Sequence, residues 1–239
     1  MLLDDPAPQS YYAQGIKALH DHWAGHAENH RRAAIENLLR QVASMVNLPM
    51  PQVVWKDSGS SFFRIAQWEI HASLMSVTTN PETDFKEWLH KVTSPYHELR
   101  HADQHRVLLE AYLTKALALP VPFTRGTAVG GHLPSAFQRE EYPYPQHIIM
   151  MIRTQKQEFQ QAWIPQARSW SDSIYGAHSR FRRDTMETLM TKGKEHHYGT
   201  YRSLPEEADA FAVQTEVKRR IKSLIRLADE DLQLADLFG

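Results

Sequence analysis

The spacing of apolar residues limits the folds open to this chain more than any other feature. Between Ser10 and Val46 apolar residues recur every three or four positions without a proline, which predicts one long amphipathic helix. Residues 66–74 instead alternate between apolar and polar side chains, as a strand with one buried face does. Helical spacing returns in the later segments: 85–92, 146–162, 181–190 and a last long helix from Pro205 that ends near Leu237. The pattern predicts a mainly helical α+β fold with a small β-sheet.

Length and composition indicate a globular protein. The chain has 239 residues, 42% hydrophobic and 23% charged, enough to bury a sizeable core in one large domain or two small ones. We predict a single domain over residues 1–239. It includes an N-terminal helical extension at residues 1–50 and a long surface loop rich in proline and glycine at residues 120–145.

Charge and cysteine content exclude several function classes. The net charge is −1 and the basic residues are scattered, so we expect no nucleic-acid partner and no membrane span. The amino terminus, MLLDDPAPQSYY, lacks the basic region and apolar run of a standard signal peptide, so we expect synthesis in the cytoplasm. The absence of cysteine excludes disulfides, thiolate zinc ligands and thiol catalysis.

A His-Glu-x-x-His stretch carries the clearest chemistry. Ser94 and Pro95 predict that a new or kinked helix begins there and runs to about Leu117. His97 and His101 are four residues apart, so both imidazoles lie on one face of this helix and can bind one Zn²⁺. Glu98 can then take a proton from a zinc-bound water.

A catalytic zinc site needs a third protein ligand. His105 lies about 12 Å from His97 along a straight helix, too far to share the ion, and Gln104 is expected to lie on the helix surface. The last predicted helix offers a glutamate. Ser203 and Glu206 fit a capping box, which leaves Glu207 as the predicted ligand, with Glu206 as its main rival and then Asp209.

These motifs resemble a known family. His97-Glu98-x-x-His101-x-x-Gln104, followed about a hundred residues later by Pro205-x-Glu207-x-x-Ala210, resembles the zincin-type metallopeptidases with a glutamate ligand (gluzincin-like). More narrowly, it resembles metallopeptidase domains of bacterial polymorphic toxins and secretion-system effectors. The resemblance implies His97, His101 and Glu207 as ligands on helices 94–117 and 205–228, with Glu98 as general base. It also implies an edge strand at 66–74 for an extended substrate.

Two further groups of residues bear on the site. A zinc peptidase needs a second group near the metal that stabilises the oxyanion, and the candidates just before the last helix are His196, His197, Tyr198 and Tyr201. The histidines at 20, 22, 26 and 30 are expected to form a solvated helical face, because a second metal site there would need ligands from elsewhere.

The prediction is a zinc metallopeptidase that hydrolyses a protein or peptide substrate. The resemblance implies a bacterial protein, either a stand-alone enzyme or an effector or toxin that a dedicated system secretes. For the effector, the expected partner is an immunity protein or the secretion machinery. Two alternatives stay open: a binding module on a zincin scaffold without catalysis, and a zinc-dependent peptidoglycan amidase.

Overall fold

The computed structural model describes residues 2–119, 144–155, 160–176, 178–192 and 194–238. It is mainly helical with one small sheet, which confirms the predicted fold class at that level. Contacts divide the chain into two compact units. Unit 1 comprises Met1–Phe63, Glu69–Arg100 and Ala212–Gly239, and unit 2 comprises Arg64–Trp68 and His101–Phe211. Whether they form one functional domain stays a prediction.

Unit 1 begins with two helices where one was expected over residues 10–46. The elements are α1 (Pro6–Asp21), the short 3-10 helix η1 (Trp23–Gly25) and α2 (Glu28–Met45). The chain turns at η1 because Trp23 is buried there. Arg31 fixes this turn: its Nη2 donates to the Trp23 carbonyl at 2.7 Å, and its guanidinium lies 4.4 Å from the centre of the Trp23 ring.

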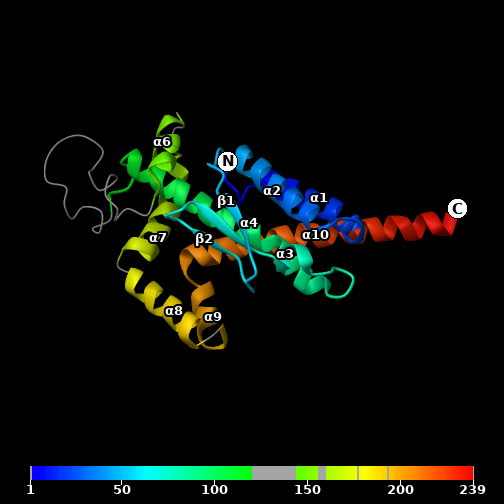
Figure 1. The fold of residues 1–239 in the computed structure, drawn as a ribbon. Helices are drawn as coiled ribbons and strands as arrows, with labels where there is room; N and C mark the ends of the chain where they lie inside the picture. Colours follow the sequence, from blue (N-terminus) through cyan, green and yellow to red (C-terminus); the bar gives the residue numbers. More distant parts are fainter. Residues whose placement is uncertain (1, 120–143, 156–159, 177, 193, 239) are drawn as a thin grey trace. The chain divides into compact units, whose positions relative to one another are not determined.

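The turn lets α1 and α2 lie side by side, as Figure 1 shows. Gly15 allows their close approach, because a Cβ atom at this position would come within 2.1 Å of the Leu38 side chain.

A three-stranded sheet follows, in the order β1-β3-β2. The strands are β1 (Gln52–Lys56), β2 (Phe62–Arg64) and β3 (Glu69–Ser73), and β1 pairs with β3 in parallel. The expectation of an edge strand at 66–74 is wrong, because β3 is the central strand and four of its five residues are buried. The alternating pattern suggested an exposed polar face, but His71 and Ser73 are buried and have partners. His71 contacts Phe62 and Glu69, and the Ser73 hydroxyl donates to the Ser58 carbonyl.

Helix α3 (Met75–Thr78) precedes the long helix α4 (Phe85–Leu113). No new helix begins at Ser94, because α4 continues through Pro95, and α4 ends at Leu113 instead of near Leu117. Pro95 has no N–H group, so the Lys91 carbonyl loses its usual helical donor. The Ser76 hydroxyl replaces it and donates to that carbonyl at 2.8 Å.

The helices of unit 2 were predicted less accurately from the apolar spacing than those of unit 1. They are α6 (Gln146–Thr154), η3 (Gln161–Trp163), α7 (Ile164–Tyr175), α8 (Ser179–Lys192) and α9 (Lys194–Arg202). The helix expected over 146–162 ends at Thr154, and α7 and α9 lie in segments where the apolar spacing predicts no helix. The predicted loop at 120–145 lies outside the described residues except for Tyr144 and Pro145.

Helix α10 (Pro205–Phe238) begins where the sequence predicts the last helix and ends beside the predicted Leu237. Within unit 1 it packs on α4, where the Gln214 amide donates to the Thr93 hydroxyl at 3.2 Å. None of the described helices is both long and apolar enough to cross a membrane.

Candidate metal centre

His97, Glu98 and His101 form a group on consecutive turns of α4. One ligand atom from each lies within 4.8 Å of the others, and among the described residues this is the one such group of three. His97 and Glu98 are 5% and 7% exposed. The histidines come together because residues four apart share a face of a helix.

The turn of α4 that carries this group is anchored from behind. The Tyr96 hydroxyl donates to the Leu3 carbonyl at 2.9 Å, and the Tyr12 hydroxyl donates to the Val92 carbonyl at 2.7 Å. Arg100 is fully buried and lies 3.3 Å from the Asp4 carboxylate. These contacts of unit 1 fix the rotation of α4 about its axis, and with it the face that His97 and Glu98 occupy.

Within unit 2, Glu207 in the first turn of α10 lies beside His101. The distance from the His101 Nε2 atom to the Glu207 Oε2 atom is 3.4 Å, and Glu207 is 4% exposed. Of the three acidic candidates on α10, Glu207 is the one for which the structure gives a contact with His101. That it binds a metal stays a prediction.

The other two acidic candidates have different partners. The Arg182 Nε atom donates to the Glu206 carboxylate at 2.6 Å, and the Ser203 hydroxyl donates to the Thr200 carbonyl. The predicted capping box is therefore wrong. Glu206 turns to Arg182 because a buried carboxylate is better stabilised by a cation than by one backbone donor.

Gln104 links α4 to α10 in unit 2, although it was expected on the helix surface. It is 1% exposed, and its amide nitrogen donates to the Glu206 carbonyl at 2.8 Å and to the Asp209 carboxylate at 2.7 Å. Its amide oxygen lies 2.9 Å from the His101 Nδ1 atom. Gln166 also donates to Asp209, at 3.1 Å. Asp209 therefore positions Gln104, which in turn positions the His101 ring.

His105 lies four residues beyond His101 and has its own partner. Its Nδ1 atom lies 2.9 Å from the Tyr144 hydroxyl. Burial above all, and then the electrostatic effects of His101 and Arg182, lower the pKa of His105 to about 3. The ring is therefore neutral at physiological pH.

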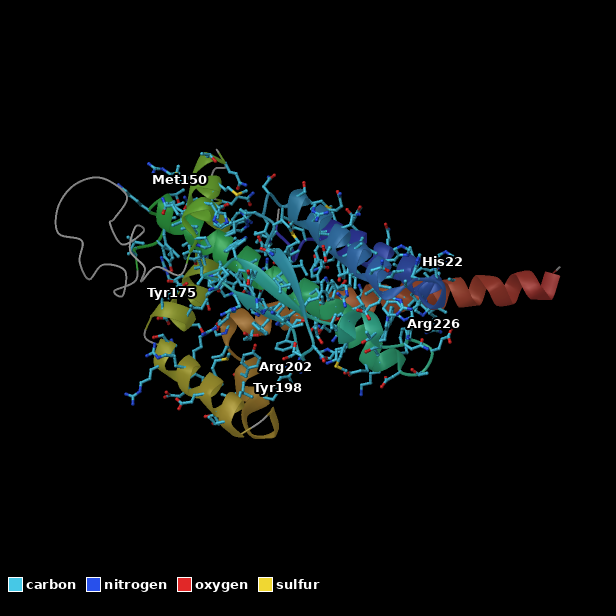
Figure 2. The ribbon with its side chains drawn as sticks, viewed as in Figure 1. His22, Met150, Tyr175, Tyr198, Arg202 and Arg226 are labelled. Atoms are coloured by element: carbon cyan, nitrogen blue, oxygen red, sulfur yellow. The ribbon has the colours of Figure 1, made fainter. Side chains whose placement is uncertain are left out.

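The tyrosines predicted to stabilise the oxyanion lie in an aromatic cluster of unit 2. Tyr198 and Tyr201 on α9 stack with ring centres 6.3 Å apart, and both meet Phe211 edge-on. Figure 2 labels Tyr198 beside Arg202, whose guanidinium lies 5.8 Å from the Tyr198 ring. His196 and His197 belong to α9, but their side chains lie outside the described part of the chain.

Tyr198 is the member of this cluster with an electrostatic link to Glu207. Burial raises the pKa of the Tyr198 hydroxyl, Arg202 opposes this rise, and the negative charge of Glu207 adds to it. Its hydroxyl therefore stays protonated at neutral pH and can donate a hydrogen bond.

Sequence reasoning missed Arg182 and Tyr144 as parts of this region, and it included Gln104 in the motif without assigning it a contact. Of these three residues, only Gln104 could be placed near His101 from the sequence, because residues three apart share a helix face. No family model, characterised protein or solved structure shows significant similarity to this chain. The chemistry of these side chains is therefore the basis for a functional conclusion.

Proposed function

We propose that the protein is a zinc-dependent peptidase in which His97, His101 and Glu207 bind the metal ion and Glu98 is the general base. The proposal depends on the 3.4 Å distance between the His101 Nε2 and Glu207 Oε2 atoms. Two ligand atoms that lie about 2.0–2.1 Å from one tetrahedral Zn²⁺ are about 3.3 Å from each other. The observed distance therefore suits two ligands of a shared ion.

The hydrogen bonds of Gln104 support this assignment. Its amide nitrogen faces two acceptors, the Glu206 carbonyl and the Asp209 carboxylate, so its amide oxygen must be the atom beside His101. That oxygen can only accept, so the Nδ1 atom of His101 carries a proton and donates it.

A neutral His101 ring then presents the lone pair of Nε2 to the Glu207 carboxylate. Two acceptors at 3.4 Å require a cation or a proton between them. A divalent ion meets this requirement and is the arrangement we propose. The other arrangement has a proton in place of the ion, on His101 or on Glu207, and analysis of bound metal separates the two.

The side chains of the proposed site have distinct roles. A bound Zn²⁺ supplies a lowered water pKa of about 7 and polarises the substrate carbonyl. Glu98 is almost buried beside the two histidines, so we assign it the transfer of a proton from the attacking water to the leaving amine. Tyr198 is the proposed donor to the oxyanion. Secretion and an immunity protein stay predictions from the resemblance.

The test is cleavage of a mixed peptide library, read by mass spectrometry, for the wild type and Glu98→Gln. We expect the variant to lose about 10²–10⁴-fold in rate, because it cannot accept a proton, while it keeps its zinc and its fold. Glu187→Gln on the exposed side of α8 is the matched control and should be fully active. Equal cleavage by Glu98→Gln would contradict the assigned role, and cleavage of peptidoglycan crosslinks alone would favour the amidase.

A further inference from the structure

Arg182 on α8 has more hydrogen-bond donors than its neighbours use. Its Nε atom donates to the Glu206 carboxylate at 2.6 Å. Within the described part of the chain, the Nη1 and Nη2 atoms of this guanidinium have no hydrogen-bond partner. A guanidinium carries N–H groups on Nε and on both Nη atoms, and it stays charged at physiological pH. The donors of both Nη atoms are therefore available to another acceptor.

The contact with Glu206 leaves the guanidinium fork open. An arginine that neutralises a carboxylate frequently binds both of its oxygens through two parallel hydrogen bonds. Here the Glu206 Oε1 atom accepts from Nε, while the buried Oε2 atom has no partner among the described residues. The side chain of Arg182 is 28% exposed, whereas that of Glu206 is 2% exposed. Glu206 thus holds Arg182 by one nitrogen, and part of the arginine remains accessible to a ligand.

Arg182 lies near the proposed zinc ligands of unit 2. Its partner Glu206 directly precedes Glu207 in the first turn of α10. After burial, the electrostatic effects of His101 and Arg182 are the next causes of the low pKa of His105, so both groups lie close to that ring. Arg182 is therefore a fixed cation beside the part of the site that His101 and Glu207 form.

The chemistry of this cation selects a carboxylate. The planar fork of an arginine matches the two oxygens of a carboxylate, and hydrogen bonds between charged groups are the strong ones. In a peptide, carboxylates occur on Asp and Glu side chains and at the carboxyl terminus. We propose that Arg182 binds a carboxylate of the substrate, so that the enzyme prefers peptides that carry one near the cleaved bond. This inference rests on the proposed peptidase function and adds a substrate class and a specificity-determining residue.

The experiment compares kcat/KM of the full chain on peptide pools that differ only in their carboxylates. One pool has blocked ends and Asp or Glu at varied positions, a second has Asn or Gln in their place, and a third is the second pool with a free carboxyl terminus. We expect the first or the third pool to be cleaved about 10–100-fold faster than the second, as charged hydrogen bonds allow. The preferred pool identifies which carboxylate binds. Equal rates on all pools would overturn the inference and leave the peptidase proposal intact.

Variants of Arg182 separate substrate binding from support of Glu206. Arg182→Gln can still donate a hydrogen bond to Glu206 but has no charge, so it should cleave all pools at the wild-type rate for the neutral pool. Arg182→Lys restores the charge without the fork and should recover part of the preference. Arg183→Lys, at the neighbouring exposed arginine of α8, is the matched control and should keep the full preference. If Arg182→Gln lowers the rates on all pools by the same factor, the arginine only supports Glu206 and the inference is overturned.

Peptide binding gives a readout that does not depend on cleavage. Fluorescence anisotropy of labelled peptides from the three pools is measured with Glu98→Gln and with the double variant Glu98→Gln, Arg182→Gln. The single variant should bind peptides with the preferred carboxylate about 10–100-fold more tightly than neutral ones, and the double variant should show no preference. If no pool is cleaved by the wild type but this binding preference is found, the peptidase proposal fails and the carboxylate site stands. Binding without any preference would overturn the site.

Discussion

At the scale of single residues, Gln104 decides how His101 is presented. Its amide is held by the Glu206 carbonyl and the Asp209 carboxylate, and in turn it fixes the proton of His101 on Nδ1. Partners of this kind orient a histidine ligand and raise its affinity for metal.

Gln104→Leu should therefore weaken zinc binding about 10–100-fold, as loss of an outer partner of a ligand does. The measurement is the zinc dissociation constant by competition with a chelating dye. The exposed Gln161 provides a control, and Gln161→Leu should bind zinc like the wild type. An unchanged constant in Gln104→Leu would show that His101 does not need this partner.

The grouping of His97, Glu98 and His101 could be predicted from sequence, because helical periodicity is local. The role of Gln104 could not, since its two acceptors lie 102 and 105 residues away along the chain. A glutamine at that spacing is compatible with a helix surface until the neighbouring helix is known.

At the scale of elements, α4 continues through a proline because another element supplies the missing donor. The fully buried Ser76 hydroxyl donates to the Lys91 carbonyl that Pro95 leaves without a helical partner.

Ser76→Ala is expected to lower the free energy of unfolding by about 1–3 kcal/mol, because it leaves a buried carbonyl without a donor. Pro95→Ala restores an N–H group to the helix, so Ser76→Ala should lower the free energy of unfolding by less in the Pro95→Ala variant than in the wild type. Urea unfolding of the wild type, both single variants and the double variant measures this coupling. Equal costs in the two backgrounds would exclude the compensation.

The errors at this scale have a shared cause. A proline indicates a helix start at Ser94 when no other group can donate a hydrogen bond to the Lys91 carbonyl. Here α3 supplies such a donor, the Ser76 hydroxyl. Likewise, the break between α1 and α2 depends on Arg31 binding the Trp23 carbonyl. Apolar spacing describes which side chains are buried, but these contacts decide where a helix ends.

At the scale of the whole molecule, the stability of the fold should depend on pH through His105. Its pKa is about 3 in the folded chain and about 6.5 when unfolded, so the unfolded state binds more protons below pH 6.5. The contribution of the neutral ring to the free energy of unfolding is complete above pH 6.5, and it is lost as the pH falls toward 3.

Between pH 7 and pH 5 the wild type should lose about 2 kcal/mol more stability than His105→Phe, which cannot titrate at this position. Urea unfolding at the two pH values measures the difference, and the other histidines are common to both proteins. Equal losses would mean that His105 is not kept neutral by the fold.

The fold class was predictable at this scale, since periodicity and composition report helix content and a small sheet. The division into two units was not, because each unit joins segments far apart in sequence. Such joins depend on contacts between distant helices, as between Gln214 and Thr93, which no local pattern encodes.

The most direct test of the proposed zinc centre is the metal content of the purified chain. Elemental analysis would follow dialysis that removes weakly bound ions, without added zinc or an affinity tag. The account predicts one zinc per chain in the wild type and in His147→Ala, a control at an exposed histidine of α6, and its loss in His101→Ala and Glu207→Gln with helicity unchanged. A wild type that carries no metal and takes up none from micromolar zinc would contradict it.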